Sequence, residues 1–278
     1  MLSVGLSLTT PDFRDIFQNK RIFLVALFSK IVLFPLMGLL VAYWWGLSPT
    51  FQLGIFLLLI CPGGTTSNVI TYWFSGTTAL TISLTVITSF IAVFLIPPLV
   101  NWSHHHYLGD RVVVDLPVFE TTANIFLIVI LPVLVGMLFR LYRPKPAIVA
   151  ERIIKNVSVV LLGILYFIKF FASKQHGGAE LHLNELLALL PPLLLINVLA
   201  MLIGFFFPKL FGLNNRDCMT IGIELGLQNL SLALVVGTIL LRNEDLVKPA
   251  LIYAMFSFWT AALFGFLVKK WFFEKNWV

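Results

Sequence analysis

Polar side chains that could bind an ion or a small ligand interrupt two long apolar stretches of this 278-residue chain. The first interruption is residues 61–68, with the sequence CPGGTTSN, and the second is residues 221–229, with the sequence IGIELGLQN. Proline and glycine break helical hydrogen bonding, and freed backbone inside a bilayer is tolerated only where it is buried in protein or lines a polar cavity. A carboxylate in an apolar span, such as Glu224, is costly and usually functional. Both interruptions are therefore candidates for a binding site.

The composition indicates the class of protein that must position these residues. Hydrophobic residues make up 59% of the chain and charged residues 12%, and the mean hydropathy is +0.96. These values are too apolar for a soluble globular protein and predict an all-α polytopic membrane protein. Apolar stretches of about 20 residues predict eight spans, near 21–45, 50–74, 77–100, 118–140, 152–172, 184–208, 216–240 and 246–268.

The net charge of +6 follows the ends of the spans and does not indicate a nucleic-acid partner. On the side of residue 1, loops and termini carry 13 basic residues: Arg14, Lys20, Arg21, Arg140, Arg143, Lys145, Arg152, Lys155, Lys209, Arg216, Lys269, Lys270 and Lys275. The other side carries 5: Arg111, Lys169, Lys174, Arg242 and Lys248. Because cytoplasmic loops are enriched in Lys and Arg, both termini are predicted to be cytoplasmic.

The two interrupted spans occupy equivalent places in an internal repeat. The second span and the seventh each lie between two uninterrupted spans. The offset between the two triplets is five spans, an odd number, so equivalent helices cross the membrane in opposite directions. This is the inverted-topology repeat of secondary transporters, whose site lies at the repeat interface. Only nine residues precede the first triplet, whereas two spans precede the second, so we expect either that Met1 is an internal methionine of a longer protein or that the first half is shortened.

Cysteine and histidine do not form a recognisable framework. Cys61 and Cys218 are expected to be free thiols. The run His104–His106 could suggest a metal site, but no further ligands lie at helical spacing, and a solvated loop is the favoured interpretation.

The two motifs together resemble the bile acid:sodium symporter family, in a bacterial-type member. CPGGTTSN is followed by Thr81 and Thr85, and ELGLQN comes about 150 residues later. The resemblance covers nearly the whole chain and implies one transmembrane transporter domain, 1–278, with two broken helices that cross. The implied core is 21–100 and 184–270, and the implied panel is 1–9 and 118–172.

The resemblance also implies how sodium is bound. Sodium is a hard cation, and unwound carbonyls, hydroxyls and amide oxygens can bind it while one carboxylate neutralises it. By similarity, the first sodium site uses Ser67, Asn68, Thr81, Thr85 and Glu224. A second site uses Glu224, Gln228 and the carbonyls of Leu225 and Leu227. Pro62, Gly63, Gly64 and Asn229 are tentative substrate contacts.

Lys30 is the main departure from the family. Relatives carry a glutamine five residues before the proline that corresponds to Pro35, and it helps bind the second sodium. An ammonium group there would be repelled by sodium and attracted to Glu224. We therefore predict that Lys30 replaces the second cation, and that coupling falls to one sodium or shifts towards protons.

Each of these residues also has a structural interpretation. Pro62 with its two glycines could be a simple kink, since both residue types are common in membrane helices. Threonine hydroxyls such as those of Thr81 and Thr85 often bond to their own helix. Lys30 could extend its ammonium group towards the membrane surface, and Asn229 could form a helix–helix hydrogen bond.

The predicted function is sodium-coupled symport of an organic anion, bile acid-like or a small carboxylate, by alternating access. No cofactor beyond sodium as coupling ion and no enzymatic activity are expected, because no Ser/Lys pair, Asp pair or zinc motif occurs within the spans. The predicted location is a bacterial inner membrane, with the lipid bilayer as partner and a monomer as the assembly. The alternative is a non-transporting membrane binding protein or sensor that keeps the ion site.

Overall fold

The computed structural model describes residues 1–7, 20–108, 117–172 and 176–273. These residues form helices joined by short connections, with no β-strand among them and one isolated bridge. The helices are α1 (Leu2–Ser7), α3 (Lys20–Phe28), η1 (Ser29–Leu33), α4 (Phe34–Trp44), α5 (Pro49–Ile60), α6 (Thr65–Trp73), α7 (Thr78–Leu108), α8 (Val118–Ile125), η3 (Phe126–Ile130), α9 (Leu131–Tyr142), α10 (Pro144–Phe171), α11 (Leu183–Leu210), α12 (Asn215–Gly226), α13 (Leu230–Val235), η5 (Val236–Leu240), η6 (Glu244–Val247), α14 (Lys248–Val268) and η7 (Lys269–Phe273). The predicted all-α fold is confirmed.

All eight predicted spans have a helical counterpart. Within the described ranges, six continuous helical segments are long and apolar enough to cross a membrane, and two shorter apolar helices, α5 and α13 with η5, belong to the interrupted spans. Two boundaries differ from the prediction, since α10 begins at Pro144 and α7 continues to Leu108. His104–His106 therefore lie in a helix, and the loop prediction was wrong. No proline or glycine follows Pro98 before residue 109, so nothing in the sequence ends α7 earlier.

Prolines shape the first and fourth spans without breaking them. Pro35 follows the π-helical segment η1, and Pro132 follows the π-helical segment η3. A proline ring collides with the carbonyl one turn earlier, and a wider turn relieves that clash. Lys30 lies in the wider turn that precedes Pro35.

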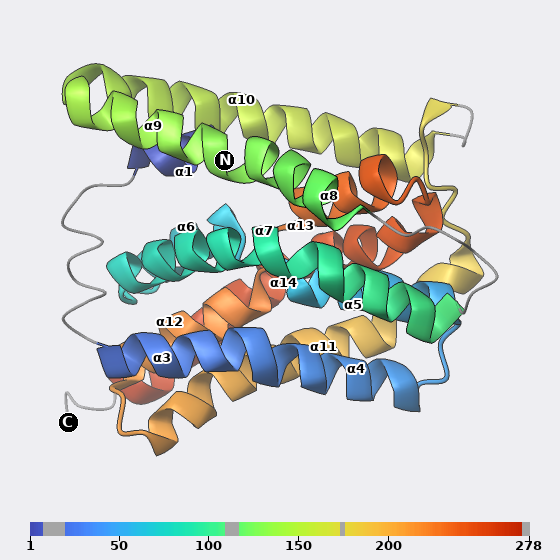
Figure 1. Ribbon diagram of the computed structural model, residues 1–278. Coiled ribbons are helices and arrows are strands. Elements are labelled where there is room, and N and C mark those ends of the chain that lie inside the picture. Colours follow the sequence, from blue (N-terminus) through green and yellow to red (C-terminus); the bar gives the residue numbers. More distant parts are fainter. Residues whose placement is uncertain (8–19, 109–116, 173–175, 274–278) are drawn as a thin grey trace.

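The helices form two groups (Figure 1). An outer layer consists of α1, α8, η3, α9 and α10, and α1 packs against both α9 and α10. The main bundle consists of α3 to α7 and α11 to η7, with its largest contact between α11 and α12. There Gly204 and Gly222 meet, and a Cβ on Gly204 would come within 2.6 Å of the Gly222 Cα. The two groups match the predicted panel and core in position, and their division into domains stays a prediction.

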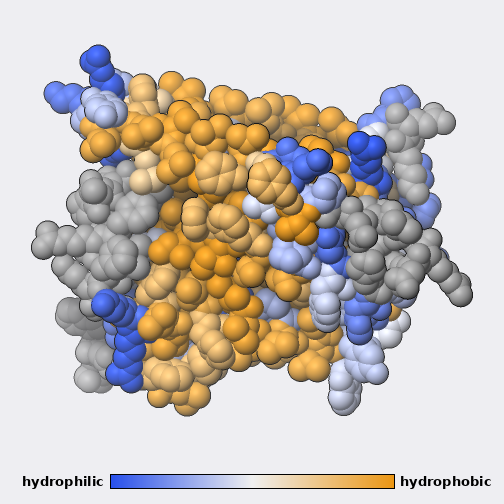
Figure 2. Space-filling view, in the orientation of Figure 1, coloured by the Kyte–Doolittle hydropathy of each residue, from blue (hydrophilic) through white to orange (hydrophobic). Residues whose placement is uncertain are grey.

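The surface carries a hydrophobic belt between two hydrophilic ends (Figure 2). We call one of them the basic end, where α3 begins, α9 meets α10, and α11 meets α12. The described basic residues at this end are Lys20, Arg21, Arg140, Arg143, Lys145, Lys209, Arg216, Lys269 and Lys270. Arg152 and Lys155 were predicted at a span end on this side and lie inside α10 instead, because that helix begins at Pro144. The predicted charges at Arg14, Arg111, Lys174 and Lys275 lie outside the described residues. A belt of this kind is what a bilayer requires.

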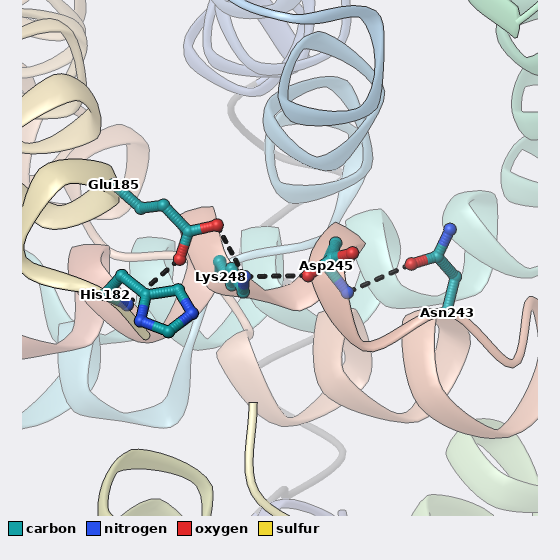
Figure 3. A network of polar contacts seen from close by, with 5 residues as sticks. All are labelled: His182, Glu185, Asn243, Asp245 and Lys248. Carbon is teal, nitrogen blue, oxygen red and sulfur yellow. Dashed lines mark hydrogen bonds and ion pairs between the residues drawn. The ribbon is translucent and has the colours of Figure 1, made fainter. Parts of the chain in front are cut away.

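The opposite end has lysines that are neutralised by acids. The Lys248 Nζ lies 2.7 Å from Glu185 Oε1 and 2.7 Å from Asp245 Oδ1 (Figure 3). The Glu185 carboxylate also accepts a hydrogen bond from the His182 backbone at 3.0 Å, which closes the first turn of α11. Among the described residues, ion pairs are found for Lys169 and Lys248 at this end and for no Lys or Arg at the basic end, and the orientation of the termini stays a prediction.

Candidate functional site

The two interrupted spans meet where their helices are unwound. Gly63 and Gln228 form an antiparallel bridge. The Gly64 N–H donates to the Leu227 carbonyl at 2.9 Å, and the Asn229 N–H donates to the Pro62 carbonyl at 2.8 Å. Backbone groups that leave a helix inside a membrane must find partners within the protein. Each unwound segment supplies those partners for the other, so the broken helices cross at residues 62–64 and 227–229.

Glycine at 63 and 64 is required by the closeness of this crossing. A Cβ on Gly63 would collide with the Glu224 carboxylate, and a Cβ on Gly64 would lie 2.6 Å from the Gln228 carbonyl oxygen. The first break therefore does more than kink a helix. It brings backbone against a charged group.

The Glu224 carboxylate is held by three hydroxyl groups from two other helices. Glu224 is 1% exposed. Ser67 Oγ of α6 donates to Oε2 at 2.5 Å, Thr81 Oγ1 of α7 donates to the same oxygen at 2.6 Å, and Thr85 Oγ1 donates to Oε1 at 2.8 Å. Hydrogen bonds to a carboxylate are roughly twice as strong as those between neutral groups. The carboxylate is therefore fixed in position at the crossing.

Thr81 and Thr85 reach across to α12 instead of bonding to their own helix. They lie four residues apart on α7 and therefore share one face. Thr88, three residues further on, shows the other behaviour, because its hydroxyl donates to the Leu84 carbonyl of the same helix at 2.7 Å. Each hydroxyl that donates to Glu224 keeps lone pairs that could bind a cation.

Asn68 follows Ser67 on α6 and carries a buried oxygen without a partner. Among the described residues, the side-chain oxygens that are buried and lack a hydrogen bond are Asn68 Oδ1 and Thr71 Oγ1. A buried carbonyl oxygen without a donor is costly and uncommon. A buried oxygen in this state suits a hard cation.

Lys30 enters the site from η1 in the main bundle. It is 4% exposed, and its ammonium group donates to Gln228 Oε1. The ammonium also lies 5.0 Å from the centre of the Phe34 ring. Within the described parts of the chain, its hydrogen bond goes to Gln228 and not to Glu224. The hydrogen bond is therefore made one turn beyond Glu224 along the chain, while the Lys30 ammonium and the Glu224 carboxylate still attract each other electrostatically.

The other predicted ligands of the second sodium site surround Gln228. The Gln228 Nε2 donates to the Leu225 carbonyl at 2.5 Å, and the Leu227 carbonyl accepts from the Gly64 N–H. Asn229 caps α13, since its Oδ1 accepts from the Leu232 N–H at 3.1 Å. The predicted ion-site residues therefore lie on η1, α6, α7 and α12 and on the unwound segment that follows α12.

Three polar residues that support the crossing were not predicted from the sequence. Asn197 Nδ2 of α11 donates to the Gly226 carbonyl at 2.8 Å, and Tyr253 Oη of α14 donates to the same carbonyl at 2.9 Å. Thr260 Oγ1 in turn donates to Asn197 Oδ1 at 2.5 Å. Gly226 ends α12, so this group binds a carbonyl that the break leaves without a helical partner. An asparagine in the middle of an apolar span was the signal that could have found it.

A cavity of about 440 Å³ separates the outer layer from the main bundle in the half of the protein nearer the basic end. Its wall on the bundle side comes from α6 and the start of α7, and its wall on the outer side comes from α1 and α10. The lining residues are Ser3, Val4, Ser7, Thr65, Thr66, Asn68, Val69, Tyr72, Trp73, Thr78, Ile82, Glu151, Lys155, Ser158, Val159 and Leu162. A second cavity of about 330 Å³ lies against the crossing, between α10 and α14, and is lined in part by Thr66, Tyr166 and Gln228. The tentative contacts Pro62, Gly63, Gly64 and Asn229 lie beside these spaces and do not line either one.

The two cysteines form no disulfide with each other. Cys61 and Cys218 are free and buried, as predicted. In the described ranges, no three His, Cys, Asp or Glu side chains gather in a way that could hold a metal ion. The ligand chemistry of the crossing is therefore that of oxygen atoms and one ammonium group.

A polytopic helical membrane protein with two broken helices that cross around a buried carboxylate is the class that this fold and site define. The family model described as the sodium bile acid symporter family matches residues 1–177. The chain belongs to that family, as the motifs indicated.

Named relatives extend over most of the chain. A probable sodium/metabolite cotransporter, BASS2, from rice chloroplasts is 30% identical over 250 residues, which are 90% of this chain and 57% of the rice protein. An uncharacterised sodium-dependent transporter, YocS, of Bacillus subtilis is 26% identical over 273 residues, covering 98% of this chain and 80% of that protein. The rabbit ileal sodium/bile acid cotransporter is 23% identical over 267 residues, covering 95% of this chain and 75% of that protein. The chain thus spans a little over half the length of the rice relative.

Proposed function

We propose that this protein couples the movement of sodium to the transport of an organic anion across a membrane by alternating access. The observation that carries the proposal is Glu224, a buried carboxylate held by three hydroxyls where two broken helices cross. Relatives named as sodium-dependent transporters or cotransporters support it. Neither cofactor nor enzymatic step is part of the proposal.

The sodium ion would bind to Ser67, Asn68, Thr81, Thr85 and Glu224. Two features favour these residues. The Asn68 Oδ1 is buried without a donor, which a bound cation would correct. The hydroxyls that donate to Glu224 can offer their lone pairs to sodium at the same time. Glu224 supplies the negative charge that offsets the ion in this buried region.

Lys30 would replace a second sodium ion. The second site implied by the family consists of Glu224, Gln228 and the carbonyls of Leu225 and Leu227. The Lys30 ammonium already contacts Gln228 Oε1, which is an oxygen that this sodium would need. A fixed positive charge at this place would repel a second cation, so we propose that a single sodium drives transport.

The substrate would bind between the outer layer and the main bundle. Thr65 and Thr66 begin α6 and line the cavity of about 440 Å³. A helix N-terminus carries partial positive charge and free N–H groups that favour an anion. Pro62, Gly63, Gly64 and Asn229, at the crossing, would shape the inner end of this space and change it when the crossing moves.

We place the protein in a bacterial plasma membrane as a monomer, with both termini in the cytoplasm. The Lys and Arg residues described at the basic end support the orientation, and the Bacillus relative is consistent with a bacterial membrane. In this orientation the cavity of about 440 Å³ lies in the half of the protein nearer the cytoplasm.

The test is uptake of labelled taurocholate and labelled glycerate into proteoliposomes under an inward sodium gradient, with potassium as the ionic control. The wild-type protein should take up at least one of these anions with sodium only, and Glu224→Gln should abolish the uptake. Glu120→Gln is the matched control, because Glu120 is an exposed acid on α8 away from the crossing. Uptake that is equal in potassium, or that survives Glu224→Gln, would contradict the proposal. Sodium-dependent thermal stabilisation without uptake would instead support the non-transporting sensor.

A further inference from the structure

Two charged side chains of α10, Lys155 and Glu151, line the cavity of about 440 Å³, opposite α6; we call it the large cavity. We propose that they select a substrate with a single negative charge, a hydroxylated monocarboxylate or monosulfonate. Lys155 binds the acidic group, and Glu151 excludes a second one. This inference rests on the proposed transport of an organic anion. It specifies the charge of that anion and the two residues that select for it.

The two residues lie on the cavity face of α10. Glu151, Lys155, Ser158 and Leu162 follow each other at intervals of three or four residues, and all four line the cavity. This spacing places them in one row along a helix. Lys155 is about 6 Å further from the basic end than Glu151, since a helix rises about 1.5 Å per residue.

Within the described residues, neither Glu151 nor Lys155 forms an ion pair. In the segments that the structure describes, the ion pairs involve Lys169 and Lys248, both at the opposite end. Lys155 is exposed and Glu151 is partly exposed, and neither has a hydrogen bond to another described residue. A charge placed this far along a spanning helix is costly unless it faces a water-filled space or a ligand. The cavity gives the Lys155 ammonium that space.

The facing wall determines where an acidic group would lie. Thr65 and Thr66 begin α6, and both residues line the same cavity. An anion between this helix end and Lys155 would gain a full positive charge on one side and a partial one on the other. Ser3, Ser7 and Ser158 add hydroxyls around the cavity that can bond to hydroxyl groups on the substrate.

Glu151 limits the charge that the cavity accepts. It lies one turn nearer the basic end, beside the path by which the rest of the substrate would extend. A second carboxylate in that direction would meet the like charge of the partly exposed Glu151 carboxylate and would be repelled by it. One lysine and one glutamate thus leave the cavity suited to one net negative charge.

The experiment measures binding by thermal shift with purified protein in saturating sodium chloride. The probes are glycerate, a hydroxylated monocarboxylate; malate, a hydroxylated dicarboxylate; and taurocholate, a monosulfonate. The variants are Lys155→Gln, Lys155→Arg and Glu151→Gln. Arg152→Gln is the matched control, because Arg152 is an exposed neighbour on α10 that does not line the cavity.

The wild-type protein should bind glycerate or taurocholate and should bind malate at least tenfold more weakly. Lys155→Gln should weaken binding of the monoanion by about tenfold or more, as expected for a charge-assisted hydrogen bond, and Lys155→Arg should keep most of it. Glu151→Gln should improve malate binding by about tenfold, since it removes a like charge. Arg152→Gln should change none of these values.

Several outcomes would overturn the inference. These are wild-type binding of malate as tight as that of the monoanions, no binding of any monoanion, or equal loss of melting temperature in Lys155→Gln and Glu151→Gln without a change in charge preference. The last result would mean that Lys155 and Glu151 stabilise α10 and do not select the substrate. Sodium alone should still stabilise every variant. Failure of sodium to stabilise even the wild-type protein would contradict the proposed function, whereas sodium stabilisation with a preference for malate would contradict this inference alone.

Discussion

Lys169, near the end of α10, and Glu244, at the start of η6, form an ion pair with an N–O distance of 2.6 Å. The pair joins the outer layer to the main bundle at the end opposite the large cavity. Beneath it, Tyr166 and Phe170 of α10 pack on a buried cluster that contains Leu234 and Val247. The protein is therefore closed between its two layers at this end, while the cavity separates them nearer the basic end.

The first prediction is that this ion pair holds the closed end together. Lys169→Gln should expose the space between α10 and α14, which a water-soluble maleimide can report through Ala254→Cys in a background with Cys61 and Cys218 replaced. We expect labelling to rise by about fivefold, because a partly exposed ion pair contributes up to about 1 kcal/mol. Exchanging the two charges, with Lys169→Glu and Glu244→Lys together, should restore protection.

Arg242→Gln is the control for that experiment. Arg242 is an exposed residue at the same end, and no ion pair is found for it within the described residues. If Arg242→Gln raises labelling as much as Lys169→Gln does, loss of positive charge at this end is the cause and the ion pair is not.

The second prediction concerns the hydroxyls around Glu224. Thr81→Val and Thr85→Val keep the shape of each side chain but remove a hydrogen bond to the carboxylate and a possible sodium ligand. We expect each to weaken sodium binding by about 10- to 100-fold, as is typical when a group that orients a metal ligand is lost. A sodium titration followed by thermal shift measures the sodium affinity of each variant.

Thr88→Val provides the comparison for both substitutions. Its hydroxyl is buried on the same helix but bonds to the Leu84 carbonyl. It should leave the sodium affinity unchanged. Equal effects of all three substitutions would show that α7 responds to any lost hydroxyl, and that Thr81 and Thr85 have no special part.

The third prediction is that Lys30→Gln adds one sodium ion per transported anion. Glutamine removes the fixed charge and supplies an oxygen beside Gln228, so a second cation can bind. The ratio of labelled sodium to labelled anion in proteoliposomes measures the change. Lys30→Met removes the charge without supplying an oxygen and should not raise the ratio. An unchanged ratio in Lys30→Gln would rule out the replacement of a cation by Lys30.

The fourth prediction tests the crossing itself. Gly63→Ala places a methyl group against the Glu224 carboxylate, which must then move away from its hydroxyl partners. We expect a loss of about 1–3 kcal/mol in stability, as for overpacking in a tight interior, together with loss of sodium-dependent stabilisation. Gly163→Ala is the control, since nothing lies within 4 Å of its added Cβ. If both variants behave alike, the crossing is looser than described.

Much of the architecture follows from local sequence. Apolar stretches placed all eight spans, because a helix must bury about 20 apolar residues to cross a bilayer. The proline and two glycines at 62–64 indicated the first break. Glu224 indicated the second, because a charged residue in an apolar span is costly and usually functional. The limits of α7 and α10 were less certain, because both helices continue past the apolar stretch into polar residues that are also compatible with a helix.

The residues that support the crossing could not be predicted from local sequence. Asn197, Tyr253 and Thr260 come from two helices distant in sequence, and their role depends on the Gly226 carbonyl between them. In the same way, the hydrogen bond from Lys30 to Gln228 joins residues 198 positions apart. The residue types alone are compatible with several partners.

The sequence by itself determined that this chain spans a membrane with two helices broken by polar residues, and its motifs indicated the family. Span length, helix breaking and the cost of a buried charge are local properties, so a single sequence carries them. The tertiary structure decided which groups meet: three hydroxyls on Glu224, an ammonium on Gln228, and a cavity with one lysine and one glutamate on its wall. Those contacts depend on how helices distant in sequence pack, and packing is set by the shapes of all the helices together.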